Sequence, residues 1–464
     1  MRLVIVGGGG FRVPLIYRAL LRERGPARPT RVVLYDPDPV RLSVITAVLR
    51  QLSAESTGTA GSLEADGAAG VGGAAPEVTA TGDLPAALTG ADVVFAALRV
   101  GGVRGRTVDE RVALRAGVLG QETVGAGGIA YGLRTVPVLR RLAELIRERA
   151  PRAWTINFTN PAGLVTEAMA EVLGDRVIGI CDSPSALAGR LARALRVVPE
   201  RLRVDYAGLN HLGWARRALV DGVDRLGELL ADDAALDSFE EGRVFGAQRL
   251  RRLGAVPNEY LHYYYDTEAA LRSVRAARQT RGEYLRDQQE RFYAAAAARP
   301  DAALALWRDA LARREESYSA EVRRATGGGE RDRDDVVAGG YENVAVPLLA
   351  ALRGTAPARL VLNVRGGGAL PGLDAGAVVE LPCLVDSNGA QPLAAAPLGE
   401  PELELVRRVK ATERLTIEAA RTGSRSLAAE AFAAHPLVGP AVAERLVADY
   451  RAASPEIAEV LARR

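Results

Sequence analysis

The chain has 464 residues, of which 48% are hydrophobic and 25% charged, and its formal net charge is +3. This length and apolar content are enough for two or three packed domains. The small net charge, with arginines spread among acids, argues against a nucleic-acid surface or a membrane-binding stripe. We therefore expect a globular protein that binds small molecules, with no nucleic acid and no membrane as partner.

The N-terminus and the cysteines predict a cytoplasmic protein. The apolar run Leu3–Val6 is short and is followed at once by glycines, unlike the apolar core of a signal peptide. No uncharged apolar stretch has the length of a membrane span. The two cysteines, Cys181 and Cys383, are expected to be reduced thiols because a single bridge is uncommon in a large chain without a secretory signal.

Alternating strand and helix patterns in the first part of the chain predict an α/β domain. Leu3–Val6, a helix near 13–23, Arg31–Tyr35 and a helix near 40–52 form a βαβ unit. The Gly-, Ala-, Ser- and Thr-rich segment 53–75 is expected to be a surface loop. Further strand patterns occur at Val78–Ala80, Asp92–Ala97, Ala153–Phe158 and Arg176–Ile180. Residues 1–182 are therefore predicted to form a Rossmann-type, doubly wound parallel sheet that binds NAD.

Residues 183–464 are predicted to form a second α/β domain, for substrate binding, catalysis and oligomerisation. The expected strands are Arg201–Tyr206, Trp214–Val220, Leu360–Val364 and Val378–Val385. Segment 237–324 is largely helical in pattern, and amphipathic stretches at Glu402–Ala420 and Ala441–Ala462 predict closing helices. Segment 327–335 lacks an apolar period and is predicted to be a solvated loop.

A run of four glycines suggests a nucleotide site. Gly7, Gly8, Gly9 and Gly10 lie between the first strand and the first helix, where a pyrophosphate can approach the backbone. Asp36 ends the second strand and could bind ribose hydroxyls, which favours NAD over its 2′-phosphorylated form. Arg12 stands where the third fingerprint glycine is expected. The alternative is a glycine-rich turn without a ligand.

Cys181 and His211 are candidate metal ligands because each follows an apolar or alternating run, where α/β proteins build their sites. A thiolate and an imidazole suit a borderline metal such as Zn, Fe or Mn, and two protein ligands leave an open site. The alternatives are a buried apolar cysteine and a satisfied core histidine. Asn160 and Asp182 could be helix N-caps, because each stands shortly before a proline.

Tyr260 opens a segment with four tyrosines in six residues. One interpretation is an aromatic helix face with Tyr260 and Tyr264 at i,i+4. The other is a catalytic base: an unperturbed tyrosine pKa is about 10, so a phenol needs a nearby cation to accept a proton at neutral pH. A metal held by Cys181 and His211 would supply that cation.

An ordered set of motifs resembles the NAD- and metal-dependent glycosidases of glycoside hydrolase family 4. The set covers nearly the whole chain and comprises Val-Gly-Gly-Gly, Arg-Val-Gly-Gly with Arg106 and Asp109-Glu110, Gly-Gln-Glu-Thr, Asn-Phe-Thr-Asn-Pro, the Cys181 segment, Gly-Leu-Asn-His-Leu, Pro-x-x-Tyr-Leu-x-Tyr-Tyr and Thr280-Arg281. The resemblance implies a second domain similar to the C-terminal domain of lactate and malate dehydrogenases. It also implies a homodimer or homotetramer.

The resemblance implies roles for individual residues. Cys181 and His211 resemble the ligands of a divalent metal, most often Mn²⁺, and Tyr260 resembles the base that removes the sugar C2 proton. Arg106, Asn160 and Arg281 occupy substrate-binding positions, and Arg281 is similar to an arginine that meets a 6-phosphate. The implied reaction oxidises the sugar at C3 with NAD⁺, eliminates the aglycone, adds water and reduces the ketone again.

The expected function is hydrolysis of 6-phospho-β-glucosides, with a phosphorylated disaccharide or an aryl glucoside as substrate. The chain departs from the family in three places. Asp182 resembles the α-glucoside branch, where this aspartate protonates the leaving group. Phe11-Arg12-Val13 replaces small hydroxyl residues beside the glycines, and Gly366-Gly367 replaces a usual asparagine pair after Arg365. A 6-phospho-α-glucosidase or another α-glycosidase of the family is therefore the first alternative. An NAD-dependent 2-hydroxy-acid dehydrogenase and a non-catalytic NAD-binding sensor are alternatives from other classes.

Overall fold

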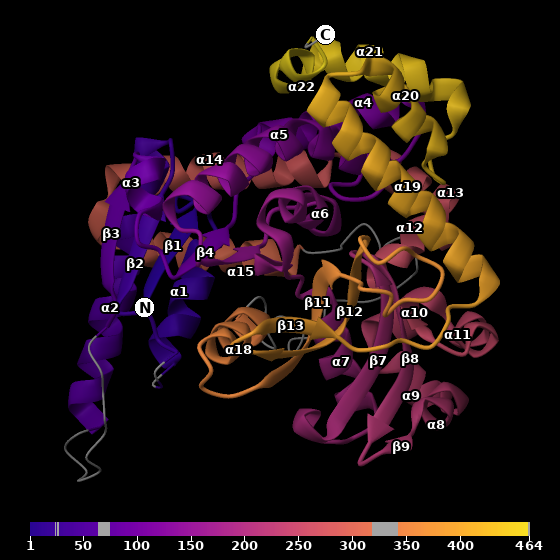
Figure 1. Cartoon of the computed structure of the whole chain (residues 1–464), viewed down its shortest axis with the longest axis horizontal. Coiled ribbons are helices and arrows are strands. Elements are labelled where there is room, and N and C mark those ends of the chain that lie inside the picture. The colour runs from indigo at the N-terminus through magenta and orange to yellow at the C-terminus, as the bar shows by residue number, and fades with distance from the viewer. Residues whose placement is uncertain (24, 26, 64–74, 318–341, 463–464) are drawn as a thin grey trace.

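The computed structural model describes residues 1–23, 25, 27–63, 75–317 and 342–462. Six parallel strands form the N-terminal half of one continuous sheet. Figure 1 labels β1, β2, β3 and β4 of this half at the left. In spatial order they are β3 (Glu77–Thr81), β2 (Arg31–Tyr35), β1 (Arg2–Val6), β4 (Val93–Ala96), β5 (Trp154–Asn157) and β6 (Val177–Gly179). This 3-2-1-4-5-6 order is that of a dinucleotide-binding fold, so the predicted doubly wound sheet is confirmed.

The sheet continues beyond β6 with antiparallel strands. These are β11 (Ala358–Arg365), β12 (Val378–Asp386), β7 (Leu202–Leu209), β8 (Leu212–Val220) and β10 (Val256–Pro257), with β13 (Gly389–Pro392) paired to β12 and β9 (Val223–Asp224) to β8. The second part of the chain is thus an α/β structure joined edge to edge with the first. The domain boundary between residues 182 and 183 stays a prediction.

Helices cover both faces of the parallel half. Leu3 and Ile5 of β1 pack on one helical layer, whereas Val4 and Val6 pack on the other, because successive side chains of a strand point to opposite faces. The first layer contains α1 (Val13–Arg22), α2 (Pro39–Leu63), α14 (Arg281–Ala298), α15 (Ala303–Glu316) and α18 (Glu342–Leu352). The second contains α3 (Leu84–Leu88), α4 (Gly102–Ala116), α5 (Ala126–Arg149), α6 (Ala162–Leu173) and the C-terminal helices.

The antiparallel half has its own apolar core. The helices near it are α7 (Ser183–Ala194), α8 (Leu226–Ala231), α9 (Asp233–Asp237), α10 (Glu240–Phe245), α11 (Ala247–Leu253), α12 (His262–Tyr265) and α13 (Thr267–Ala276). Figure 1 shows β7 and β8 with α7, α8, α9, α10 and α11 at the lower right, and α12 and α13 above them, apart from the N-terminal strands at the left. Helices α14 and α15 follow in sequence but return to the N-terminal half, where α15 contacts α2 and α14 contacts α4.

The prediction of a loop at residues 53–75 is wrong for its first part, because helix α2 continues to Leu63. Tertiary contacts compensate for the weak helix formers here. Ser53 Oγ lies 2.6 Å from the Tyr17 hydroxyl, and Glu55 pairs with Arg308 of α15 at 2.6 Å. Residues 64–74, together with the predicted loop 327–335, lie outside the described residues.

The C-terminal helices differ from prediction in number. The stretch predicted at 402–420 is α19 (Glu400–Thr422), and an unpredicted α20 (Arg425–Ala434) follows. The stretch predicted at 441–462 is divided into α21 (Ala443–Ala453) and α22 (Pro455–Val460). The division occurs because Ser454 caps α22 through the Ile457 N–H and Pro455 begins the new helix.

In the part of the chain that the structure describes, no helix combines the length and apolar character needed to cross a bilayer.

Candidate active site

The carboxyl ends of β1, β4, β5 and β6 open into one cleft of about 540 Å³. A ligand site at this edge is expected where the strand order of a doubly wound sheet reverses. Ten of the twelve residues predicted for the site line the cleft: Gly7, Gly10, Asp36, Arg106, Asn160, Cys181, Asp182, His211, Tyr260 and Arg281. The antiparallel half contributes His211 and Tyr260, so both halves of the sheet build the cleft.

Gly8 and Gly9 do not line the cleft but shape the loop beneath it. The Gly8 N–H donates to the Tyr35 carbonyl oxygen at 2.7 Å, and the Gly9 N–H donates to Asp36 Oδ2 at 3.0 Å. A Cβ on Gly8 would lie 2.7 Å from Leu34 Cβ, so the loop can only pack on β2 without a side chain there. Gly7, with φ of 90°, and Gly10 are left to face a ligand.

Asp36 lies where a ribose is bound in dinucleotide folds. Its Oδ1 accepts the Asp38 N–H at 3.0 Å, while Oδ2 accepts from Gly9. These bonds fix the carboxylate at the end of β2 with one edge toward the cleft. The arrangement fits the ribose hydroxyls of NAD, which need an acceptor at this place.

Cys181 and His211 meet although they come from different parts of the sheet. Cys181 follows β6, and His211 occupies the two-residue turn between β7 and β8 with a left-handed φ of 62°. Cys181 Sγ and His211 Nε2 are 3.4 Å apart, and both side chains are buried. Such strain in a non-glycine residue is typical of functional positions. Cys181 Sγ and His211 Nε2 are therefore close enough together to bind one metal ion.

Burial sets the protonation of both groups. It lowers the pKa of His211 to about 4, so the imidazole is neutral at pH 7 and retains a lone pair for a metal. Burial, followed by the charges of Glu380 and Asp182, raises the pKa of the Cys181 thiol well above its ordinary value. A metal must therefore displace the thiol proton. Among the described residues no group of three or more His, Cys, Asp and Glu could hold a metal, although Asp182 Oδ1 lies 4.0 Å from Cys181 Sγ. Two protein ligands would leave an open site.

Thr123 fixes the tautomer of His211. Its hydroxyl donates to Gln121 Oε1 at 3.0 Å, so at the 2.6 Å contact with His211 Nδ1 the threonine oxygen accepts and Nδ1 carries the hydrogen. Nε2, on the side of Cys181, then has the free lone pair. Gln121 Oε1 is held in turn by the N–H groups of Thr123 and Val124.

We expect Thr123→Val to lower the affinity for Mn²⁺ about tenfold, because the partners that orient a metal-binding histidine typically contribute about 10–100-fold. Thr123→Ser, which keeps the hydroxyl, is the matched control and should bind as the wild type. Isothermal titration of the metal into each protein measures the effect. Equal affinities for the valine and serine variants would contradict the tautomer assignment.

Tyr260 lies against His211, one of the two candidate metal ligands. It is the middle residue of a short 3₁₀ helix (Glu259–Leu261), and its ring stacks on that of His211 with a centroid distance of 3.8 Å and an interplanar angle of 6°. Tyr264 lies elsewhere, stacked on His435. The aromatic-face alternative is therefore wrong for Tyr260. The stacking places the phenol next to the position where a metal would supply the needed cation.

Asn160 and Asp182 do not act as side-chain caps. Helix α6 has Pro161 at its N-cap, so Asn160 stands one residue too early, and Asp182 occupies the N-cap of α7 without a side-chain cap hydrogen bond. The capping alternative is thus wrong for Asn160, whereas Asp182 has the predicted N-cap position but makes no side-chain cap hydrogen bond. Asn160 and Asp182 both line the cleft, which is consistent with a role toward a ligand.

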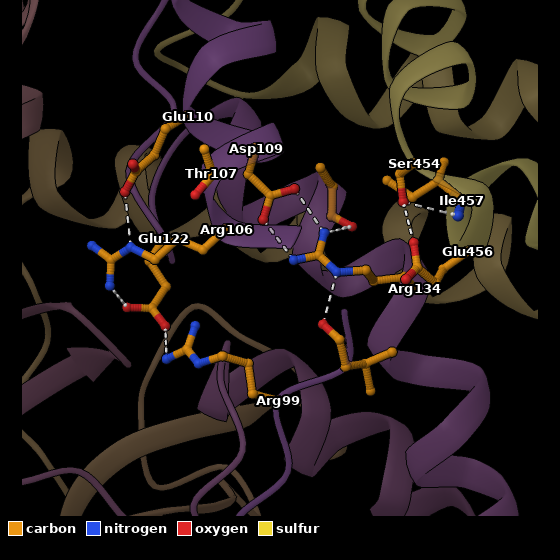
Figure 2. A network of polar contacts seen from close by, with 12 residues as sticks. Arg99, Arg106, Thr107, Asp109, Glu110, Glu122, Arg134, Ser454, Glu456 and Ile457 are labelled. Atoms are coloured by element: carbon orange, nitrogen blue, oxygen red, sulfur yellow. Dashed lines mark hydrogen bonds and ion pairs between the residues drawn. The ribbon is translucent and has the colours of Figure 1, made fainter. Parts of the chain in front are cut away.

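Glu122 connects two arginines of the cleft, as Figure 2 shows. Arg106 donates to Glu110 at 2.8 Å and to Glu122 at 2.5 Å, and Arg99 also pairs with Glu122. Although burial opposes ionisation, the two arginines hold the pKa of Glu122 well below its usual range. Arg106 is thus charge-compensated, whereas Arg99, which the sequence prediction did not single out, is the more exposed of the two.

A second buried ion pair keeps α4 and α5 together behind the cleft. Arg134 of α5 binds Asp109 of α4 through two hydrogen bonds of 2.6 and 2.7 Å, and both side chains are 1% exposed (Figure 2). Arg134 also donates to the Val100 carbonyl oxygen at 3.0 Å. This pair therefore fixes the loop that follows β4, where Arg99 lies.

Arg281 begins α14 behind a capping box. Thr280 and Glu283 exchange hydrogen bonds between side chain and backbone, which starts the helix at the cleft. The Arg281 guanidinium donates to the Ser317 carbonyl oxygen at 3.0 Å and to the Arg314 carbonyl oxygen at 3.1 Å. Backbone contacts thus position its positive charge at the cleft.

Glu380 of β12 is a fully buried carboxylate behind His211. It accepts from Asn210 Nδ2 at 3.1 Å, Asn363 Nδ2 at 2.8 Å and the Tyr206 hydroxyl at 3.2 Å. Burial raises its pKa to about 7. Because Asn210 precedes His211 in the turn, Glu380 anchors the loop that presents the histidine.

The raised pKa of Glu380 predicts a pH-dependent stability. The folded protein binds a proton that the unfolded chain releases above pH 4.5, so the free energy of unfolding falls as pH rises from about 4.5 to 7, by about 3 kcal/mol at most. Glu380→Gln keeps an acceptor for both asparagines and should lose this component. Urea unfolding of metal-free protein at pH 5 and 8 measures it; an unchanged difference in the variant would contradict the assignment.

Sequence reasoning missed Arg99, Thr123 and Glu380, and also Arg314, which lines the cleft. Arg99 follows β4, so its position at a strand end could have found it. Thr123 lies in the polar, glycine-containing connection between α4 and α5, and only its polar neighbours mark it. Glu380 lies inside an apolar strand pattern, and Arg314 lies in a helix far along the chain, so neither carries a local signal.

Two family models match the chain. The model described as Family 4 glycosyl hydrolase matches residues 2–197, and the model of the Family 4 glycosyl hydrolase C-terminal domain matches residues 206–438.

Individual relatives cover nearly the full length. A probable 6-phospho-β-glucosidase of Bacillus subtilis is 29% identical over 446 residues, which are 94% of this chain and 92% of that protein. The 6-phospho-β-glucosidase structure from Thermotoga maritima with NAD and glucose 6-phosphate has a TM-score of 0.79 and 25% identity, and 98% of this chain and 99% of that chain are covered. A 6-phospho-α-glucosidase from gut microorganisms with NAD and Mn²⁺ has a TM-score of 0.77, 25% identity and 97% coverage of both chains.

Proposed function

Because the chain belongs to glycosyl hydrolase family 4, we propose that it hydrolyses 6-phosphoglucosides with the help of NAD⁺ and a divalent metal, with Mn²⁺ as the leading candidate. The observation that carries the proposal is the meeting of three groups in one cleft. The glycine loop with Asp36, the Cys181–His211 pair and the Tyr260 phenol come from distant parts of the sequence and line the same cavity.

The residues of the cleft fit both NAD⁺ and a divalent metal. Gly7, Gly10 and Asp36 would hold the dinucleotide, and Cys181 with the Nε2 of His211 would hold the metal. When bound, NAD⁺ supplies a temporary oxidation of the sugar at C3, which acidifies the C2 proton, and the metal supplies positive charge beside the sugar oxygens.

The chain's own side chains then have separate tasks. Tyr260 accepts the C2 proton, and its stacking on His211 keeps the phenol in place. Asn160, Arg106 and Arg281 bind and orient the sugar, with Arg281 contributing a charge suited to a 6-phosphate. Asp182 delivers a proton to the leaving group. Each assignment is part of the proposal.

The β anomer is the leading substrate, as a phosphorylated disaccharide or an aryl glucoside. The names of the Bacillus subtilis and Thermotoga maritima relatives support it. Asp182, together with the α-glucosidase among the similar structures, supports the α anomer as the alternative. A comparison of α- and β-linked nitrophenyl glucoside 6-phosphates separates the two.

Cofactor dependence tests the proposed function. Dialysis against a chelator should abolish hydrolysis of nitrophenyl 6-phosphoglucoside, and Mn²⁺ should restore it, with no net NADH produced. Full turnover without metal or NAD⁺ would overturn the proposal. NADH that accumulates with substrate consumed would favour the 2-hydroxy-acid dehydrogenase instead, because the glycosidase cycle returns its electrons to the sugar.

The same proposal includes a cytoplasmic location, a homodimer or homotetramer, and a division into an NAD-binding unit of residues 1–182 and a catalytic unit of residues 183–464. Size-exclusion chromatography with light scattering measures the oligomer.

A further inference from the structure

Glu240 is a buried carboxylate that lines the cleft and receives no hydrogen bond in the part of the chain that the structure describes. It begins α10, is 6% exposed and borders the same cavity as Tyr260. No hydrogen bond or ion pair joins its side chain to another described residue. Removing a charge from water is costly unless hydrogen bonds replace the lost hydration, so this carboxylate needs donors from a ligand.

The positive charge of Arg190 in α7 is engaged by two other carboxylates. Its Nε donates to Glu241 Oε2 at 2.8 Å, and its Nη2 donates to Glu241 Oε1 and, at 3.0 Å, to Glu259 Oε2. Arg190 is 4% exposed, and Glu240 acts on it through its charge alone. Arg190 therefore attracts Glu240 but does not replace the donors that its carboxylate oxygens lost with water.

Glu259 and Asp182 border the same part of the cleft as Glu240. Glu259 begins the 3₁₀ helix of residues 259–261, and α10 contacts that helix. Ser183 Oγ donates to Glu259 Oε1 at 3.5 Å, which places the Glu259 carboxylate at the start of α7, next to Asp182. Burial raises the pKa of Glu259, and the charges of Glu240 and Asp182 raise it further. The three acids therefore lie near one another, and all three line the cleft.

We propose that Asp182, Glu259 and Glu240, the acidic wall, bind the leaving group of the substrate, and that this leaving group is a sugar whose hydroxyl groups donate to Glu240. A carboxylate only accepts hydrogen bonds, so its ligand must bring O–H or N–H donors. A metal ion does not meet this need, because no group of three or more acids, histidines or cysteines in the described ranges could hold one. Sugar hydroxyls are donors, whereas a nitrophenyl group has none.

The assignment to the leaving group rests on the proposed function, in which Asp182 protonates the departing oxygen. That oxygen must then lie beside Asp182, and the sugar bonded to it continues along the wall toward Glu259 and Glu240. Of the two substrate types in the proposed function, the acidic wall favours the phosphorylated disaccharide over the aryl glucoside.

A kinetic comparison of two substrates in Glu240→Leu tests the acidic wall. One substrate is a 1,4-linked glucose disaccharide with the 6-phosphate on its non-reducing sugar, and the other is the nitrophenyl 6-phosphoglucoside of the same anomer, both with NAD⁺ and Mn²⁺ at saturation. The ratio of kcat/KM for the disaccharide to kcat/KM for the nitrophenyl substrate should fall about 10- to 100-fold, the effect of losing a hydrogen bond to a charged group. A ratio that stays unchanged or rises would overturn the proposal.

Glu268→Leu is the matched control. Glu268 lies in α13, its side chain is 93% exposed and it does not line the cleft, so the ratio should equal that of the wild type. The melting temperature without substrate is a second readout. Glu240→Leu should equal or exceed the wild type, because it removes a buried charge that receives no hydrogen bond from the described residues. A lower melting temperature with equal losses for both substrates would identify Glu240 as structural and contradict the wall.

If the leucine variant does not fold, Glu240→Gln takes its place, since glutamine keeps the shape and one acceptor oxygen but loses the charge. The ratio should then fall about 3- to 10-fold, because a hydrogen bond to a charged acceptor is roughly twice as strong as one to a neutral acceptor. A wild-type enzyme that hydrolyses neither substrate would refute the proposed function and the acidic wall with it. An enzyme that hydrolyses both, with the same ratio in the wild type and the variant, would refute the acidic wall alone.

Discussion

Tyr260→Phe is expected to reduce kcat by about 10²- to 10⁴-fold, the contribution typical of a positioned general base. The phenyl ring can keep its stack on His211, so the fold and metal binding should be preserved while the proton acceptor is lost. The rate of hydrolysis of nitrophenyl 6-phosphoglucoside, measured at saturating NAD⁺ and Mn²⁺, checks the result.

Tyr264→Phe is the control for that substitution. Tyr264 belongs to the same segment but stacks on His435 away from the cleft, so its hydroxyl should be dispensable for the reaction. If both variants keep the wild-type rate, Tyr260 is not the base. If both lose activity equally, the effect is structural and the assignment is equally contradicted.

Cys181→Ser is expected to weaken Mn²⁺ binding by at least about 100-fold and to abolish activity at ordinary metal concentrations, because it removes one of the two proposed protein ligands. In the wild type, metal affinity should also increase with pH, since binding displaces a proton from a thiol whose pKa burial has raised. Titration calorimetry with Mn²⁺ between pH 6 and 8 measures both effects at the proposed metal site.

Cys383→Ser is the matched control because Cys383 is the other cysteine of the chain. It is buried in β12 and donates to the Leu381 carbonyl oxygen at 3.4 Å, a bond that a serine can also make. Its metal affinity should equal that of the wild type. Normal Mn²⁺ affinity in Cys181→Ser would remove the cysteine from the metal site.

Local patterns in the sequence predicted the parallel half of the fold well. Strand β1 is buried on both faces, so its sequence is a continuous apolar run. The glycines that follow it pack so closely on β2 that few other residues fit there. The carboxyl ends of such strands meet by topology, which is why strand-end position alone was enough to place Cys181 and Asn160 near the glycine loop.

Long-range packing could not be predicted in the same way. The return of α14 and α15 to the N-terminal half depends on contacts such as the Trp307 Nε1 bond to the Phe11 carbonyl oxygen at 2.9 Å, which no local pattern encodes. The same return brings Arg314 into the cleft. The stack of Tyr260 on His211 likewise requires the β7–β8 turn and the segment after β10 to meet, although each motif alone has an ordinary structural explanation.

Hydrolysis in D₂O tests the central claim most directly. Removal of the C2 proton by Tyr260 and later return of a proton from solvent predict that the glucose 6-phosphate formed carries deuterium at C2, visible by proton NMR as loss of the C2 signal. A product with an undiminished C2 proton signal, formed at the full rate, would contradict the account, because a direct displacement at C1 leaves that bond untouched.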